Sequence, residues 1–348
     1  MSTYGEVVRA EKVVCDLRSD TVTRPCADMR QAMANAEVGD DVLGEDPSVN
    51  ELECMLAEML GHEAGCFVSS GTQANLVAML SHCDRGDEVI TGRGYHVQSN
   101  EAVGASVLGG IAMDALDVRP DGALSLSAVK QAIKEDDLHY PVSRLVCLEN
   151  THDGRAIALE QMLEVSTLAR KMGLAVHLDG ARLFNASKFL NCGPADIAGA
   201  ADTVSVCLSK GLGAPAGSVL LGPKDLMPRV RRNRKLLGGG MRQSGVLAAA
   251  GLYALNNNIA RLVDDHERAV KLGATLNDFG RGEVSVRTNM VFYTPNVPEH
   301  AALRGALAAR GVLIGGQEPE IRMVLHKDID NIALAAAIEG FEAYYEPG

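Results

Sequence analysis

Two apolar segments that each stop at a charged residue beside a glycine constrain the fold of this chain most. The first covers residues 174–178 and is followed by Asp179 and Gly180; the second covers residues 203–208 and is followed by Ser209, Lys210 and a glycine. Runs of this length predict buried strands of a mostly parallel sheet. Ligands bind beyond the carboxyl ends of such strands, so we expect a carboxylate and an amine in one cleft.

These two side chains suit a pyridine cofactor. A carboxylate can hold a protonated pyridine nitrogen and a lysine can form an imine, which are the two groups that pyridoxal 5'-phosphate (PLP) requires of a protein. The ordinary alternative is that Asp179 caps the next turn and that Lys210 lies on the surface, where both residue types usually occur. Their shared position at the ends of buried-type strands favours the cofactor.

Helix and strand patterns alternate from residue 47 onward. A proline opens a helix with apolar residues at helical spacing, and Gly61 ends it. Strand candidates are residues 66–68, 88–91, 145–149, 174–178, 203–208 and 218–221. The alternation predicts an α/β fold, with a mostly parallel sheet covered by helices.

The character of the sequence changes after residue 250. A long polar helix is predicted over 256–277, and shorter strands and helices follow it. We therefore expect two domains: an N-terminal arm plus a large α/β domain over 1–250, and a small α+β domain over 251–348. The acidic run at 264–267 is predicted to be a solvated helix face, because adjacent helix residues point in different directions and cannot converge on one metal ion. No metal is expected.

Charge and cysteine usage exclude several classes of protein. The 348-residue chain carries a formal charge of −12, which argues against a nucleic-acid partner. The basic run at 229–235 is predicted to be a solvated helix face or a counter-charge for a small anion. Eight cysteines without a Cys-x-x-Cys pair predict reduced, buried thiols. No signal pattern and no apolar stretch of about 20 residues are recognisable, so a cytoplasmic location without membrane contact is expected.

Residues 69–75, Ser-Ser-Gly-Thr-Gln-Ala-Asn, lie where a predicted strand turns into a helix. Backbone N–H groups and the dipole at a helix N-terminus favour an anion, so this turn is either a phosphate cradle or an ordinary serine cap. It is not a Walker loop, because no Gly-Lys-Ser/Thr follows. It also lacks the Gly-x-Gly-x-x-Gly spacing, which disfavours a nicotinamide dehydrogenase.

Histidines and arginines add further candidates. His96 follows a predicted strand and could lie against an aromatic cofactor, accept a proton, or be an ordinary loop residue. His139 and His152 flank the strand at 145–149 with the same alternatives. Arg322, in an apolar run, needs an acidic partner that is either structural or a substrate carboxylate. Arg242, after three glycines, could reach an anion.

Together these segments resemble the L-threonine aldolases of the low-specificity and L-allo-threonine type, which are PLP-dependent enzymes of fold type I, like aspartate aminotransferase. The resemblance covers nearly the full chain in the family's order. The segments that carry it are residues 16–23, 38–42, 69–75, 148–152, 178–182, 209–215 and 238–243. It implies a large domain with a mostly parallel sheet and a smaller C-terminal α+β domain.

The resemblance implies how PLP would be held. Lys210 would bind it as an imine, Asp179 would keep its pyridine nitrogen protonated, and His96 would stack on its ring. The other cofactor-binding residues, with Arg242 supplied by a neighbouring subunit, would be Ser70, Gly71, Thr72, Arg182, Ser209 and Arg242.

It also implies the substrate contacts. The substrate carboxylate would be held by Ser19, Arg182 and Arg322, and His139 would stand near the β-hydroxyl. The base that removes the hydroxyl proton stays open between His96, His139 and an ordered water, with His96 favoured as the stacking residue.

The reaction that the resemblance implies is cleavage of L-threonine or L-allo-threonine to glycine and acetaldehyde. The enzyme would be a homotetramer, a dimer of dimers with shared active sites. A β-eliminating lyase or an aminotransferase of the same fold would share Asp179 and Lys210. The alternative from a different class is a non-catalytic PLP-binding regulatory protein, for which no helix-turn-helix extension is recognisable.

Overall fold

The computed structural model describes residues 12–346, and its contacts divide the chain into two compact units. Residues 25–259 form the larger unit, while the smaller unit combines residues up to Arg24 with those from Ala260 onward. This differs from the expected division at residue 250 with an N-terminal arm on the larger domain. The reason is that β1 (Cys15–Asp16) pairs in parallel with β11 (Val312–Leu313), which joins the N-terminal segment to the smaller unit.

A seven-stranded sheet in the order β2-β8-β7-β6-β5-β3-β4 forms the centre of the larger unit. β8 runs antiparallel to both of its neighbours, and the other strands run parallel to one another. The predicted mostly parallel sheet is therefore confirmed. The strands are β2 (Ala64–Val68), β3 (Asp87–Gly92), β4 (Ala112–Leu116), β5 (Val142–Glu149), β6 (Ala175–Asp179), β7 (Thr203–Cys207) and β8 (Ser218–Gly222).

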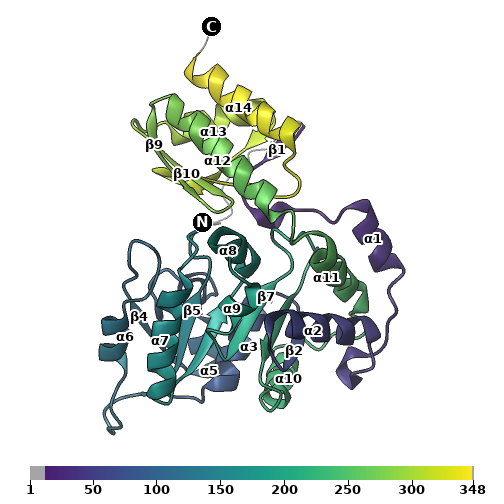
Figure 1. Cartoon of the computed structure of the whole chain (residues 1–348), viewed down its shortest axis with the longest axis vertical. Coiled ribbons are helices and arrows are strands. Elements are labelled where there is room, and N and C mark those ends of the chain that lie inside the picture. Colours follow the sequence, from purple (N-terminus) through teal and green to yellow (C-terminus); the bar gives the residue numbers. More distant parts are fainter. Residues whose placement is uncertain (1–11, 347–348) are drawn as a thin grey trace. The chain divides into compact units, whose positions relative to one another are not determined.

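Helices cover both faces of this sheet. In Figure 1, α7 lies in front of the sheet and α3 and α5 lie behind it. The helical elements of the larger unit are α1 (Ala27–Ala34), η2 (Asp41–Leu43), α2 (Pro47–Leu60), α3 (Gly71–His82), α4 (His96–Ser99), α5 (Gly104–Gly109), α6 (Leu126–Ala132), α7 (Leu159–Lys171), α8 (Leu183–Leu190), α9 (Pro194–Ala198), α10 (Met227–Leu236) and α11 (Gly245–Asn257).

Local sequence explains the ends of α2. Asp46 caps its N-terminus by accepting a hydrogen bond from the Val49 N–H at 3.1 Å, and proline occupies the first turn, where no N–H is needed. Gly61 ends the helix at φ +70°, a conformation that favours glycine.

The smaller unit holds a four-stranded antiparallel sheet in the order β12-β13-β10-β9. Its core gathers buried residues of β1, β10, β11, β13 and three long helices. The remaining elements are η1 (Asp20–Val22), α12 (Leu262–Asp278), β9 (Gly282–Arg287), β10 (Met290–Pro295), α13 (His300–Ala309), β12 (Gly315–Gln317), β13 (Glu320–Val324) and α14 (Asn331–Tyr345).

Two predicted solvated helix faces are exposed over most of their charged residues, but each contains one buried residue that the prediction missed. Asp265 is fully buried on α12 and pairs with Arg261 and Arg268, because it follows Leu262 at the helical spacing of the core-facing residues. In the basic run, Arg234 is buried and its Nη1 lies 2.9 Å from Oδ2 of Asp41. Each of these groups is buried with a partner of opposite charge.

The remaining bulk predictions concern thiols and membranes. Cys66, Cys147 and Cys207 are free and buried, as predicted for small apolar side chains. Within residues 12–346, every helix is too short or too polar to cross a bilayer.

Candidate functional site

The carboxyl ends of the parallel strands bring several chemically active side chains to one edge of the large sheet. Asp179 is the last residue of β6 and is paired with Glu149, the last residue of β5. Lys210 follows the end of β7 by three residues, and His96 begins α4 shortly after β3. The sheet therefore assembles the predicted acid, amine and imidazole from segments that are far apart in the sequence.

The carboxylate of Asp179 is buried and held in place on both oxygens. Its Oδ1 accepts a hydrogen bond from the Ala181 N–H at 3.0 Å, and its Oδ2 accepts one from Nδ2 of Asn75 at 2.7 Å. A buried carboxylate with neutral donors alone favours a cationic partner, such as a protonated pyridine nitrogen.

His96 lies between Asp179 and a second carboxylate. Its Nδ1 is 2.8 Å from Oε1 of Glu101 and 4.0 Å from Oδ2 of Asp179. The hydrogen bond that His96 donates to Glu101 is the main cause that raises the pKa of His96, although burial and the nearby positive charge of Lys210 oppose it. Lys210 is thus close enough to His96 for its charge to act on the imidazole.

A third carboxylate holds the backbone of this histidine. Oε2 of Glu149 accepts the His96 N–H at 2.5 Å, and its Oε1 lies 2.9 Å from Nδ1 of His152. Burial raises the pKa of Glu149, and burial also raises that of Glu101. The negative field of these groups around His96 and Asp179 favours cations in the site.

The turn before α3 is both a serine cap and a possible anion site. Ser70 caps the helix, with its Oγ accepting the Gln73 N–H at 3.2 Å. Gly71 and Thr72 are the first two residues of the helix, so their N–H groups precede its internal hydrogen bonds and can reach an anion. The two sequence interpretations are compatible.

The turn before α3 lies beside the loop that carries Lys210. The Gly217 N–H donates to the Ser69 carbonyl at 3.1 Å, and the Leu208 N–H donates to the Gly217 carbonyl at 3.1 Å. Ser209 lies next, with its Oγ 3.5 Å from Sγ of Cys207. The helix N-terminus, Ser209 and Lys210 are therefore neighbours around the start of β8.

A buried hydroxyl at this place supports an anion. Among the described residues, Ser218 Oγ is buried without a hydrogen-bond partner, and it lies 3.7 Å from where a Cβ on Gly71 would sit. An unpaired buried hydroxyl is unfavourable unless a ligand engages it. Together with Asp179 and Lys210, these donors match PLP, which presents a phosphate, an aldehyde and a pyridine nitrogen.

A metal ion is the other group that these residues could hold. The ligand atoms of His96, Glu101 and Asp179 lie within 4.8 Å of one another. However, Asn75 donates N–H hydrogen bonds to both carboxylates, and a cation would have to displace this donor. The donor set fits an organic cofactor better.

The other predicted residues of the larger unit lie in three different places. Arg182 is the N-cap residue of α8, three positions after Asp179. Arg242 is exposed, and its Nη1 pairs with Oδ2 of Asp40 at 2.8 Å. His139 is 75% exposed with Asp137 beside it, on the loop that enters the amino end of β5. This loop is at the opposite edge of the sheet from the other candidates.

Ser19 and Arg322 belong to the smaller unit, where the fold brings them together. Ser19 caps η1 and accepts the Thr21 N–H at 3.2 Å. Nη2 of Arg322, on β13, donates to the carbonyl of Arg18 at 3.4 Å, next to Ser19. This geometry puts a hydroxyl and a guanidinium in the same region of the unit.

Sequence reasoning assigned no role to Asn75, Glu101 or His177. Asn75 stands in the helix-cap motif, one turn into α3, which is a weak signal for a contact with a neighbouring strand end. His177 precedes Asp179 by two residues, so it shares its face of β6. Glu101 carries no recognisable signal, because it lies in an irregular segment.

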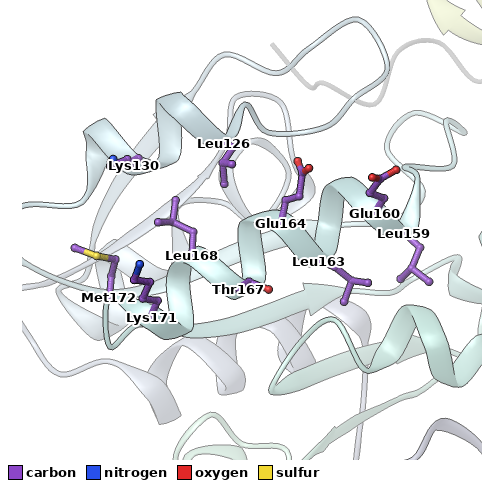
Figure 2. Close-up of a pocket in the computed structure, with 10 residues that line it drawn as sticks. All are labelled: Leu126, Lys130, Leu159, Glu160, Leu163, Glu164, Thr167, Leu168, Lys171 and Met172. Carbon is purple, nitrogen blue, oxygen red and sulfur yellow. The ribbon is translucent and has the colours of Figure 1, made fainter.

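A separate apolar cavity of about 850 Å³ lies at α6 and α7 (Figure 2). It is lined by Leu126, Lys130, Leu159, Glu160, Leu163, Glu164, Thr167, Leu168, Lys171 and Met172. It contains none of the candidate site residues, so the chemistry is assigned to the strand ends.

Comparisons with known proteins also indicate a PLP-dependent lyase. The profile of the beta-eliminating lyase family matches residues 16–296. The low-specificity L-threonine aldolase of Escherichia coli K12 is 47% identical over 329 residues, which are 94% of this chain and 98% of that protein. A probable low-specificity L-threonine aldolase 2 of Arabidopsis thaliana is 46% identical over 95% of this chain and 97% of its own length. The Leishmania major threonine aldolase structure superposes with a TM-score of 0.82 at 21% identity, over 95% and 99% of the two chains.

Proposed function

The chain belongs to the beta-eliminating lyase family, and from that premise we propose that it is a PLP-dependent carbon–carbon lyase. Its reaction is the cleavage of L-threonine or L-allo-threonine to glycine and acetaldehyde, and of related β-hydroxy-α-amino acids to glycine and other aldehydes. The observation that carries the proposal is the meeting of the Asp179 carboxylate, the His96 imidazole and the Lys210 amine at one sheet edge. The identity to threonine aldolases over nearly the whole chain supports the choice of substrate.

The chain's own residues divide the work of binding. When bound, PLP supplies an electron sink for the bond that breaks at Cα of the substrate. Lys210 would be the amine that holds the cofactor. Asp179 would accept a hydrogen bond from the protonated ring nitrogen, and its burial excludes competing water. The phosphate is assigned to Ser70, Gly71, Thr72, Ser209 and a neighbouring subunit's Arg242.

Orientation of the substrate selects which bond breaks. Ser19, Arg182 and Arg322 are assigned to the substrate carboxylate, because clamping that group determines which bond to Cα stands perpendicular to the cofactor ring. His96 is assigned to the ring face, where the hydrogen bond to Glu101 holds its imidazole. A clamp that presents the Cα–Cβ bond in this way would make it the bond that breaks, which corresponds to retro-aldol cleavage.

The base that takes the β-hydroxyl proton is one of three groups: His96, His139 or an ordered water. β5 has eight residues and spans about 26 Å, so His139 cannot reach the carboxyl edge of its own sheet. It can act only if another subunit supplies it. As the family resemblance implies, the proposed assembly is a homotetramer, a dimer of dimers with shared active sites, and we assign the protein to the cytoplasm.

The test is to mix the purified protein and PLP with L-threonine or L-allo-threonine. Acetaldehyde is followed by its reduction with NADH and added alcohol dehydrogenase, and glycine is quantified separately. Equimolar release of both products supports the lyase. Conversion of the cofactor to its amine form by the amino acid, with release of the matching keto acid, would indicate an aminotransferase. Release of ammonia together with a keto acid would indicate a β-eliminating lyase, and PLP binding without turnover a regulatory protein.

A further inference from the structure

The amide nitrogen of Asn75 donates to two acidic side chains, and its carbonyl oxygen faces other groups. It is buried, and its Nδ2 donates to Oδ2 of Asp179 at 2.7 Å and to Oε1 of Glu101 at 2.8 Å. An amide nitrogen carries two protons and ionised carboxylates only accept, so this orientation uses both donors. The carbonyl Oδ1 of Asn75 must therefore act as the acceptor in its remaining contacts.

Those contacts determine the tautomer of His177. Oδ1 of Asn75 lies 2.7 Å from Oγ of Ser205 and 3.0 Å from Nε2 of His177, which must both donate to it. Burial lowers the pKa of His177 to about 3, so the ring is neutral and carries its single proton on Nε2. Its Nδ1 is then an acceptor.

The chain of donors continues to the far end of α3. Thr203 Oγ1 is 3.0 Å from Nδ1 of His177 and donates its proton there. It accepts in turn from Nε2 of His82, also at 3.0 Å, and burial lowers the pKa of His82 to about 4. Every donor from His82 through Thr203, His177 and Asn75 thus points toward the two carboxylates.

A chain of this kind has an electrostatic effect without a net charge. Successive hydrogen bonds of the same direction polarise one another in a buried environment, which makes the last donor stronger. The last donor is Asn75, and it faces the buried carboxylates of Asp179 and Glu101. Asn75 donates a hydrogen bond to each of Asp179 and Glu101 and so links the two carboxylates, while His96 hydrogen-bonds Glu101 and lies 4.0 Å from Asp179.

We propose that Asn75 is a positioning residue that holds the Asp179 carboxylate aimed at the pyridine nitrogen of PLP, and that the donor chain through Thr203 strengthens this hold. This inference rests on one part of the proposed function, the binding of PLP, and it does not depend on the cleavage of threonine. The other hydrogen bond to the Asp179 carboxylate comes from the Ala181 N–H, and His96, at 4.0 Å, is too far from Oδ2 to donate one.

Cofactor binding without substrate tests the proposal. The dissociation constants of PLP and of 1-deazapyridoxal phosphate, whose ring has no nitrogen, are measured by equilibrium dialysis on the full chain. Asn75→Ala is expected to weaken PLP about tenfold, the worth of one hydrogen bond to a charged group. Thr203→Val is expected to weaken it about threefold, since a neutral, more distant bond is lost. Neither variant should weaken the deaza analogue.

A matched control separates this effect from general disturbance of the sheet. Thr91→Val removes a buried strand hydroxyl that bonds to the Cys147 carbonyl, outside the donor chain, and should leave both dissociation constants unchanged. If Asn75→Ala does not fold, as judged by circular dichroism, Thr203→Val decides alone.

The proposal is overturned if the variants weaken PLP and the analogue equally, if PLP binding does not change, or if the unsubstituted protein binds both alike. Failure to cleave threonine would contradict the proposed function, but it would not change the dissociation constants that test the role of Asn75. Selective loss of PLP affinity in the order Asn75→Ala, then Thr203→Val, then Thr91→Val supports the proposal.

Discussion

Oδ2 of Asp179 and Nδ1 of His96 lie 4.0 Å apart, and Glu101 makes the shorter contact to the same nitrogen. The imidazole is therefore held beside Asp179 without being its hydrogen-bond partner. The buried carboxylate can therefore pair with a cation such as a protonated pyridine nitrogen. His96 would lie beside that cation.

Asp179→Asn is expected to keep the fold and to lower kcat/KM for threonine roughly hundredfold, the scale of losing one electrostatic contact at a reacting group. A neutral amide cannot keep a pyridine nitrogen protonated. Stopped-time assays of glycine release check this, with circular dichroism for the fold. Activity near that of the unsubstituted chain would show that another group holds the nitrogen.

Lys210→Ala is expected to abolish turnover together with the visible absorption of lysine-bound PLP, because the amine that binds the cofactor is gone. Absorption spectra of the dialysed protein measure the loss directly. Lys224→Ala, on the exposed loop after β8, is the control and should retain both signals. Retention of both in the Lys210 variant would refute the assignment.

Glu101→Gln should lower the pKa of His96, because the hydrogen bond to Glu101 is the main cause that raises it. A raised histidine pKa stabilises the folded state below the unfolded value of about 6.5, and this stabilisation is lost as pH rises through the folded pKa. The raised pKa of Glu101 itself acts in the same direction.

Urea unfolding of the apoprotein at pH 6 and pH 9 measures this effect. The free energy of unfolding of the unsubstituted protein, minus that of Glu101→Gln, should be larger at pH 6 than at pH 9. Glu58→Gln, at an exposed position of α2, should show no such dependence. A difference that is equal at both pH values would contradict the role of Glu101.

The strand ends were predictable from the sequence, whereas the contacts between them were not. Asp179 and Lys210 can be recognised because each interrupts an apolar run, and parallel strands bring such interruptions to one edge. Glu101 and Asn75 meet across 26 residues through an irregular segment, for which no local pattern exists. His139 illustrates the reverse: it precedes a recognisable strand, but the direction of that strand puts it at the other edge.

The burial of Asp265 on α12 was likewise not predictable from its local sequence, and it gives a prediction for stability. Asp265→Ala should lower the free energy of unfolding by about 3 kcal/mol, because it leaves Arg261 and Arg268 without their buried partner. Denaturant titration checks it. Asp264→Ala is the matched control, since the neighbouring residue is exposed and should change stability little. Equal effects would mean that the burial of Asp265 has no energetic weight.

Arg322 tests whether the smaller unit contributes to substrate binding. If its guanidinium holds the substrate carboxylate, Arg322→Ala should raise KM for threonine at least about tenfold and should affect PLP affinity little, because a charge-assisted contact to the substrate alone is lost. Arg322→Lys should lie in between, since an ammonium keeps the charge without the planar fork. Arg310→Ala, at an exposed position of the same unit, is the control.

A normal KM in Arg322→Ala would place the carboxylate elsewhere. A parallel loss of PLP affinity and thermal stability would instead assign Arg322 to the fold, through its contact with the Arg18 carbonyl.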